Sequence, residues 1–211
     1  PSPPPQFVGR KNEWRTMGEI LERSSKGLGG VLFISGETGV GKTRLVKELE
    51  AKGLLSNFLF LRASCHEETM SIPYFPFREA FARFFQTKEE HLKYYRHLKD
   101  AYRSELVKLI PQIDESPPME ITLDKYRLFE AVRSLLFQVS HELPLFFFID
   151  DLHWADEASL ELLHYLARLV RTQRVLICGT LREEELADSK GGSLHLANTV
   201  ELMCRERLFE F

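Results

Sequence analysis

Cysteine is scarce in this chain, and its pattern excludes two classes of protein. The three cysteines, Cys65, Cys178 and Cys204, are odd in number and fit no metal-ligand spacing. A small secreted domain held by disulfides normally has paired cysteines, so we expect reduced thiols here. The sequence therefore favours a cytoplasmic protein.

Long apolar stretches are also absent. The longest strongly apolar run, 143–149, contains Pro144 and is far shorter than the roughly 20 residues that a membrane-spanning helix needs. The N-terminal segment 1–6 is rich in proline, and it resembles the end of a linker more than a signal peptide. We therefore predict no membrane contact, a linker over 1–6 and a domain over 7–211.

Neither sign of charge dominates the sequence. It has 28 Lys and Arg against 31 Asp and Glu, which gives a formal net charge of −3, and the basic residues are spread along the chain. A nucleic-acid surface usually needs a concentrated positive charge, so we predict no direct contact with nucleic acid. The 44% of hydrophobic residues is ordinary for a globular domain.

Short apolar runs alternate with helical patterns. Runs typical of strands occur at 31–34, 58–61, 145–149, 175–179 and, close to the end, 207–211. The run at 145–149 is hydrophobic throughout, which is typical of a strand covered on both faces in a parallel sheet. Asp156 is the predicted N-cap of a helix over 157–170. This alternation predicts an α/β fold, a three-layer sandwich around a parallel sheet.

The segment 72–142 has helical patterns interrupted by prolines. Helical spacing predicts two buried faces, formed by Phe77, Phe81, Phe84 and Phe85 and by Tyr94, Leu98, Tyr102, Leu106 and Leu109. The second set fits the face of one helix. Residues 183–206 are polar and show no clear pattern, and no element is predicted there.

A glycine-rich loop follows the first predicted strand. Residues 36–43 match G-x-x-x-x-G-K-[ST] at every fixed position, with a strand before them and a helix after them. Glycines let backbone N–H groups surround phosphate oxygens, and the helix directs its positive end at the same anion. Lys42 can reach the β- and γ-phosphates, and the Thr43 hydroxyl can bind Mg²⁺. The predicted nucleotide contacts are Gly36, Glu37, Thr38, Gly39, Val40, Gly41, Lys42, Thr43 and Arg44.

Two acidic residues follow the third predicted strand and fit the Walker B pattern. Ligands of a parallel sheet bind at the carboxyl ends of its strands, so Asp150 should lie near the phosphate loop and hold Mg²⁺. Asp151 should then orient or deprotonate the attacking water. Lys42 and Asp151 are therefore the predicted catalytic residues for ATP hydrolysis.

The segment 148–156, Phe-Ile-Asp-Asp-Leu-His-Trp-Ala-Asp, resembles the Walker B segment of STAND-type AAA+ ATPase modules. These modules occur in LuxR-type transcription regulators and beside some nucleotide cyclases and protein kinases. The segment 7–13 resembles their hydrophobic-Gly-Arg-x-x-Glu motif. The segments 73–77 and 179–185 resemble their proline/aromatic segment and the end of their sensor-1 strand. The resemblance covers nearly the whole chain.

This resemblance implies further site residues. Val8, Gly9 and Arg10 would lie against the adenine, with Arg10 having a structural part through Glu13 or the ribose. Arg182 would be a catalytic sensor that meets the γ-phosphate, but a surface ion pair is an equal alternative.

The family also implies a fold and a function. The fold would be an ASCE-type P-loop NTPase with sheet order 5-1-4-3-2, lacking here the lid and winged-helix segments that normally follow the fifth strand. The function would be a slow ATPase switch that takes ATP or ADP with Mg²⁺ and self-associates within a larger signalling or transcription-regulatory protein. Asp151 stands where vigorous ATPases often have Glu, which favours slow turnover. The alternatives are a P-loop small-molecule kinase and a non-hydrolysing ADP- or ATP-binding module.

Four neighbouring residues have weaker patterns. His153 and Trp154 could touch the nucleotide or a neighbouring subunit, but packing of Trp154 against the sheet edge is the preferred interpretation. Cys65 and His66 lack partners at metal-ligand spacing, so a metal or thiol site there is disfavoured.

Overall fold

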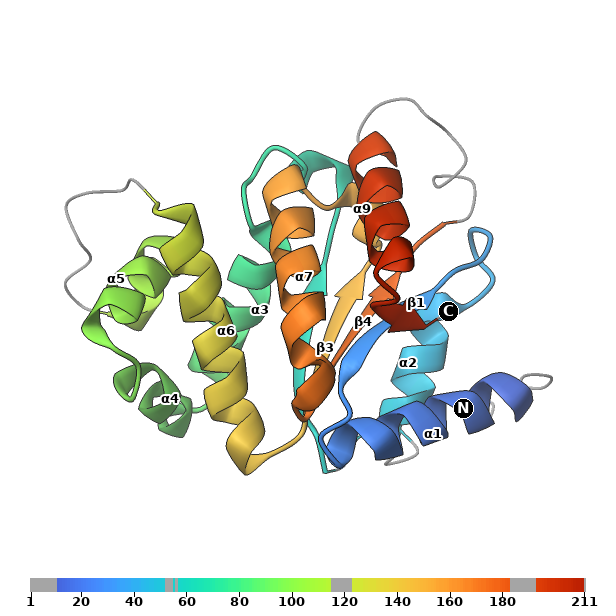
Figure 1. Ribbon diagram of the computed structural model, residues 1–211, viewed down its shortest axis with the longest axis horizontal. Helices are drawn as coiled ribbons and strands as arrows, with labels where there is room; N and C mark the ends of the chain where they lie inside the picture. The colour runs from blue at the N-terminus through green and yellow to red at the C-terminus, as the bar shows by residue number, and fades with distance from the viewer. Residues whose placement is uncertain (1–10, 52–54, 56, 115–122, 183–192, 211) are drawn as a thin grey trace, which may run out of the picture.

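The computed structural model describes residues 11–51, 55, 57–114, 123–182 and 193–210. Its centre is one parallel sheet, shown in Figure 1. The strands are β1 (Gly30–Ile34), β2 (Leu59–Ser64), β3 (Leu145–Asp150), β4 (Val175–Thr180) and β5 (Phe209–Glu210).

The four longer strands lie in the order β1-β4-β3-β2, and the short β5 pairs with β1 on its other side. The predicted order of these four strands is thereby confirmed. Ile34 is opposite Thr180 and Ser64 is opposite Asp150, so the carboxyl ends of neighbouring strands meet at one edge of the sheet. This is the arrangement of a P-loop NTPase core.

Helices cover both faces of the sheet. The bounds are α1 (Lys11–Ser25), α2 (Lys42–Ala51), α3 (Phe75–Thr87), α4 (Leu92–Arg96), α5 (Asp100–Leu109), α6 (Lys125–Glu142), α7 (Glu157–Leu169) and α9 (Ser193–Arg205). Single 3₁₀ turns lie at η1 (Glu67–Thr69), η2 (Glu89–His91), η3 (Pro111–Ile113), η4 (Leu152–Trp154) and η5 (Val170–Thr172). None of the described helices combines the length and the apolarity that a membrane crossing requires.

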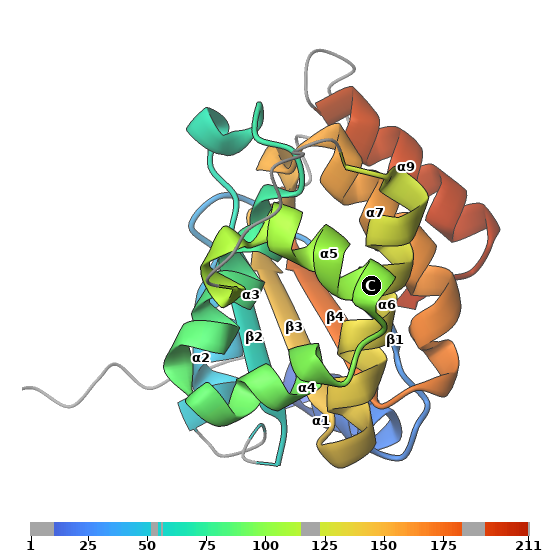
Figure 2. The same ribbon diagram turned by 90° about the vertical axis from the view of Figure 1, so that its left-hand side faces the viewer.

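The alternation of side chains along the strands divides the core in two. Phe146 and Phe148 of β3 pack in a cluster with α1 and α2. Phe147 and Ile149 of the same strand join a larger cluster with α3, α6, α7 and α9. The three layers are therefore α1 and α2, then the sheet, then the remaining helices, with α4 and α5 nearest the viewer in Figure 2.

Most predicted elements are confirmed, and the helix caps explain two boundaries. The Asp156 side chain accepts a hydrogen bond from Ser159 N (2.8 Å) and begins α7, as predicted. Asp124 begins α6 in the same way through Arg127 N (3.2 Å). The four phenylalanines predicted to form a stripe are buried on α3.

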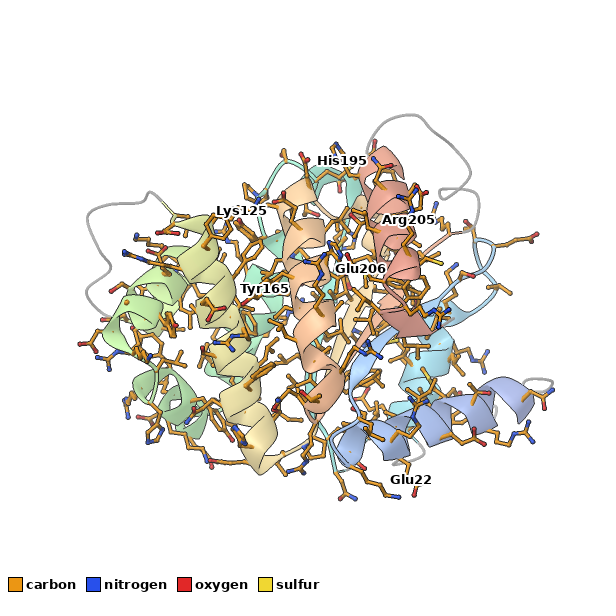
Figure 3. All side chains as sticks on the ribbon, in the orientation of Figure 1. Glu22, Lys125, Tyr165, His195, Arg205 and Glu206 are labelled. Carbon is orange, nitrogen blue, oxygen red and sulfur yellow. The ribbon has the colours of Figure 1, made fainter. Side chains whose placement is uncertain are left out.

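Two predictions from residue patterns are wrong. The set from Tyr94 to Leu109 belongs to two helices, α4 and α5, because the chain leaves the helix and Lys99 is extended. The segment 183–206 contains a helix, α9, whose buried Leu196, Val200 and Met203 face α7. Arg168 of α7 also donates hydrogen bonds to Glu206, which directly follows α9 and is labelled in Figure 3.

Candidate nucleotide-binding site

The glycine-rich loop connects the carboxyl end of β1 to α2. Gly39 and Gly41 have φ angles of 82° and 93°, which residues with a Cβ rarely adopt. The loop is largely exposed, whereas Leu45 and Val46 of α2 are buried against the sheet. The predicted loop between strand and helix is confirmed, and its backbone is positioned by a helix anchored in the core.

Lys42, the first residue of α2, directs its ammonium back into the loop. Its Nζ donates to the carbonyl oxygens of Gly36 (2.7 Å) and Glu37 (3.0 Å), and the residue is 8% exposed. The loop thus surrounds a positive charge at the amino end of a helix, where the helix dipole also favours an anion. A phosphate would replace the two carbonyl oxygens as acceptors for the same ammonium.

A chain of oxygen atoms links the first turn of α2 to the ends of two strands beside the loop. Thr43 Oγ1 lies 3.0 Å from both carboxylate oxygens of Asp150, and Thr180 Oγ1 donates to Asp150 Oδ1 at 2.6 Å. Thr43 is the second residue of α2, whereas Asp150 and Thr180 are the last residues of the neighbouring strands β3 and β4. The parallel topology therefore places a carboxylate between two hydroxyl groups, directly beside the phosphate loop.

Thr180 also fixes the residue after Asp150. Its hydroxyl oxygen accepts a hydrogen bond from Asp151 N at 2.8 Å, and Thr180 is fully buried. Asp151 has a φ of 53°, in the left-handed region that residues other than glycine seldom occupy. Its side chain is 38% exposed, unlike the buried carboxylate of Asp150. One acid therefore faces the interior of the site and the other faces outward.

The oxygen donors fit a small divalent cation. Mg²⁺ prefers carboxylate, hydroxyl and phosphate oxygens and takes few ligands from the protein when phosphates are present. Thr43 Oγ1 and the Asp150 carboxylate supply such donors within 3.0 Å of each other. Among the described residues there is no group of three or more His, Cys, Asp or Glu that forms a metal cage. Thr43 and Asp150 would thus hold Mg²⁺ together with a nucleotide.

A cavity of about 440 Å³ lies next to the loop, between α1 and β1. Met17, Ile20 and Leu32 give it apolar walls, while Asn12 and Thr16 of α1 add polar groups. Gly36 and Val40 of the loop also line it, so the cavity and the phosphate site share a border. An apolar cavity with a few polar groups suits a planar base attached to a phosphate chain.

A comparison with protein families gives the same answer as this geometry. The model of the family described as "AAA ATPase domain" matches residues 6–178. This chain belongs to the AAA ATPase domain family. The resemblance deduced from residues 148–156 is thereby confirmed at the level of the family, and AAA ATPase domains typically bind ATP with Mg²⁺.

One curated relative of this AAA ATPase domain is an uncharacterised protein of Rhizobium meliloti (strain 1021). It is 25% identical over 198 aligned residues, which represent 83% of this chain and 18% of the relative. The chain therefore spans less than a fifth of the length of the relative that it matches.

Three predicted contacts of the AAA ATPase domain lie outside the described residues. They are Val8, Gly9 and Arg10, and the side chain of Glu13 is not described either. Asn12 and Thr16, which follow these residues in the sequence, line the cavity beside α1. These two residues were not predicted, because an isolated Asn and Thr at the start of a helix are equally typical of solvent contact.

Arg44 and Arg182 lie at the border of the site. Arg44 Nε is 3.8 Å from Glu48 Oε1 on the outer surface of α2, which is an ordinary pair of residues one helical turn apart. Arg182 follows β4, is half-buried and lies two residues after Thr180. A contact of either arginine with nucleotide stays a prediction.

The residues that follow the two acids, His153, Trp154 and Asp156, contribute to packing and to local backbone structure. Trp154 is half-buried against the core, and its ring is 5.2 Å from that of the buried His153. Asp156 accepts hydrogen bonds from Tyr74 N (3.0 Å) and Phe75 N (3.2 Å), so it holds the proline/aromatic segment in place. This anchor was not predicted, although the same residue was predicted as a helix cap.

Cys65 lies close to the acids, but its thiol has low reactivity. Its N–H donates to Asp150 O at 2.9 Å, and its side chain is buried. Burial raises the pKa of the Cys65 thiol far above its ordinary value, and the nearby carboxylates, Asp156 first, raise it further. A thiol kept protonated in this way is a poor nucleophile and a poor metal ligand.

Proposed function

We propose that this domain binds ATP with Mg²⁺, hydrolyses it slowly and serves as a switch in a larger signal-transduction or transcription-regulatory protein. The family membership supports nucleotide binding. The small share of the relative that the chain covers supports a place within a longer protein. Self-association through this domain belongs to the same proposal, as does the assignment to the ASCE-type, STAND group with sheet order 5-1-4-3-2.

One observation carries the proposal. The carboxylate of Asp150 is held between the hydroxyl groups of Thr43 and Thr180, at 3.0 and 2.6 Å, beside a loop that encloses Lys42. An acid whose only purpose was to cap a loop would have no need of two hydroxyl partners, one from helix α2 and one from the neighbouring strand β4. The arrangement instead brings a metal-binding acid and a phosphate-binding loop to one point.

The residues divide the work of hydrolysis. The loop N–H groups and Lys42 would bind the phosphates and stabilise the negative charge that spreads during in-line attack. Thr43 and Asp150 would hold Mg²⁺, which supplies charge neutralisation at the phosphates. Asp151, held by Thr180 and facing outward, would orient the attacking water. Arg182 would sense the γ-phosphate from the end of β4.

Slow turnover follows from the position of Asp151. Its carboxyl group is one methylene closer to the backbone than that of Glu, and its backbone is held in a left-handed conformation. The acid therefore has little freedom to approach a water at the γ-phosphate. We expect a turnover number well below the roughly 10 per second that is typical of enzymes.

Calorimetry and a phosphate-release assay test the proposal together. The purified protein should bind ATP in the presence of Mg²⁺ and release phosphate slowly with no added acceptor. Phosphate release that depends on a small-molecule acceptor would indicate a kinase, and tight binding without turnover would indicate a non-hydrolysing module. Absence of nucleotide binding would contradict the proposal as a whole.

Lys42→Ala is the matched variant for this experiment. It removes the ammonium that lies inside the loop, so ATP affinity should fall at least about tenfold, or 1.4 kcal/mol. Lys47→Ala, an exposed lysine of the same helix outside the loop, is the control and should bind as the wild type does. Equal affinity for all three proteins in calorimetry would refute the phosphate-loop assignment.

A further inference from the structure

The strand β2 forms one edge of the sheet. Its neighbour is β3, and no other strand of the described residues pairs with it, as Figure 2 shows at the side of the sheet. Leu59 N donates to Pro144 O, and Cys65 N, directly after β2, donates to Asp150 O. The backbone N–H and C=O groups of the odd-numbered residues of β2 therefore point toward β3. By the alternation of a parallel ladder, Phe60 and Arg62 direct their N–H and C=O groups to the open edge.

Both ends of this edge are closed, whereas its middle is open. Phe58 N donates to Leu55 O (2.9 Å) at the start, and Ser64 N donates to Glu79 Oε2 (2.8 Å) at the end. Natural proteins protect edge strands against pairing with other chains in such ways. The backbone groups of Phe60 and Arg62 between these two caps therefore remain available to another strand.

A cavity of about 480 Å³ follows the open edge. It is lined by five consecutive residues, Phe58–Arg62, which extend over roughly 16 Å. Ala80 and Phe84 of α3 form an apolar wall opposite the strand. The cavity thus has the length of a short strand, a row of backbone partners on one side and an apolar wall on the other. We call it the β2 groove.

The charged residues of the β2 groove are mostly basic. Arg83 forms an ion pair with Glu79, and Lys93 forms an ion pair with Glu142. The positive charges of Arg83 and Lys93 are therefore balanced. Arg62, Lys88 and the acidic Glu90 also line the groove, and no ion pair joins any of the three to the described residues, so a small excess of positive charge remains. The Arg62 guanidinium instead lies 5.5 Å from the centre of the Phe148 ring. Its charge is thereby held next to the strand edge.

We propose that the β2 groove binds an extended, acidic peptide segment of a partner protein, which adds to the sheet as a strand. Main-chain hydrogen bonds to Phe60 and Arg62 would supply affinity, and side-chain positions would supply specificity. Alternate residues of the segment would face the apolar wall of α3, and acidic residues between them would meet Arg62, whose guanidinium lies beside Phe148 on the other face of the sheet. A second copy of this chain is a poor occupant, because its own β2 edge carries the same positive charge.

The proposal is tested with a synthetic octapeptide in which valine and glutamate alternate, capped at both ends and labelled with a fluorophore. Anisotropy with the wild-type protein should show saturable binding, at least about tenfold tighter than for the peptide with lysine in place of glutamate. N-methylation of alternate peptide residues supplies a second probe. One of the two methylation patterns should weaken binding at least about tenfold, because it removes the N–H groups that face β2, while the other pattern retains binding.

Charge-reversed variants supply the specificity test. Arg62→Glu should weaken the glutamate peptide about tenfold and strengthen the lysine peptide, since it inverts the charge beside the edge. Arg171→Glu, an exposed arginine before β4 and outside the groove, should change neither. ATP binding checks that both variants are folded, because neither residue belongs to the nucleotide site.

Four results would overturn the proposal. The first is no saturable binding of the glutamate peptide, and the second is equal binding of the two peptides. The third is an equal effect of the two methylation patterns, which would mean contact without strand addition. A concentration-dependent dimer that Arg62→Glu abolishes would assign the edge to a second copy in place of an acidic partner.

Discussion

Thr180 connects the two acids of the AAA ATPase site. Its hydroxyl donates to Asp150 and accepts from the backbone N–H of Asp151, and no water has access to this buried group. A single side chain thus sets both the direction of the metal-binding carboxylate and the backbone position of the acid that we assign to water activation. Its effect on hydrolysis should exceed its effect on nucleotide affinity.

Thr180→Val tests this positioning function, because valine keeps the shape and removes the hydroxyl. We expect phosphate release to slow by about 10- to 100-fold while ATP affinity changes less than about threefold. The free energy of unfolding should fall by about 1–3 kcal/mol, since Asp150 loses a buried partner. Thr180→Ser keeps the hydroxyl and should restore most of the rate. Equal losses in both variants would mean that Thr180 acts through packing alone.

Asp150 and Asp151 should give different defects, because one is enclosed by hydroxyl groups and the other faces outward. Asp150→Asn should make ATP binding insensitive to Mg²⁺, since a neutral amide is a weak ligand for the ion. Asp151→Asn should retain Mg²⁺-dependent binding and lose at least about 100-fold in phosphate release. Calorimetry with and without Mg²⁺ separates the two, and identical behaviour would contradict the division of roles.

Residues of the site were predictable from the sequence where they are neighbours in the sequence or directly follow a recognisable strand. Residues 36–43 are contiguous, so a motif describes their local geometry completely. Asp150 was predictable because a strand directly precedes it. Thr180 was named only as part of a resembling segment, since its function depends on β4 lying beside β3, which a linear sequence does not state.

The element β1 enters the sheet through a position with no space for a side chain. A Cβ on Gly29 would lie 2.3–2.4 Å from the carbonyl oxygens of Val170, Gln173 and Val175. These atoms belong to the backbone of η5 and the start of β4, so they cannot move aside as a side chain would. The chain at Gly29 is therefore a close contact between the start of β1 and the backbone that leads into β4.

Gly29→Ala should consequently lower the free energy of unfolding by about 2 kcal/mol or more, because backbone has to shift. Gly30→Ala is the matched control, since a Cβ there would meet nothing within 4 Å, and it should change stability by less than about 0.5 kcal/mol. Chemical denaturation of both variants measures the difference. Similar stabilities would show that the start of β4 adjusts easily.

An ionic contact ties α7 to the end of α9. Arg168 donates to Glu206 through Nε (2.7 Å) and Nη2 (2.5 Å), and His164 Nε2 lies 3.4 Å from the same carboxylate. The hydrogen bond from Arg168 lowers the pKa of Glu206 from its ordinary 4.5 to about 2. The contribution of a lowered carboxyl pKa to stability is present above the unfolded pKa and is lost as the pH falls through the folded pKa.

Glu206→Gln should therefore be less stable than the wild type near neutral pH. The difference should shrink as the pH falls below the ordinary 4.5 and disappear only below about pH 2, where Glu206 becomes protonated in the folded state as well. Urea denaturation over this pH range measures it. Glu201→Gln, which removes an ion pair inside α9 only, controls for the loss of one negative charge. A difference that grows toward low pH would contradict the assignment.

The bounds of a helix or strand were predicted more accurately the more completely its residues are buried. The strand β3 is buried at every position, and its run of apolar residues predicted it almost to the residue. The edge strand β2 extends to Ser64, beyond the predicted 58–61, because Arg62 and Ser64 interrupt the apolar run. The helix α9 was missed because its buried face is narrow, with Leu196, Val200 and Met203 set among polar residues.

For the whole molecule, sequence predicted the class of fold and the order of the four longer strands, the latter through resemblance to a family. The packing of the segment between β2 and β3 was only partly predictable. Helical spacing identified its buried faces, but spacing of three and four residues continues across a break between two helices, as it does between α4 and α5. The β2 groove had no signal in the sequence, because it arises from helices that pack beside an edge strand.

The crossing connections of the sheet have a consequence for how the domain acquires its activity. Thr43 and Asp150 are 107 positions apart in the chain, and Asp150 and Thr180 are a further 30 apart. A ribosome therefore releases the phosphate loop long before it releases the acid and the hydroxyl that complete the metal site. Because pairing of distant strands is slow, Mg²⁺-dependent affinity for ATP should be the last property to appear during synthesis. Nucleotide would then stabilise only chains in which β1, β4 and β3 have already paired.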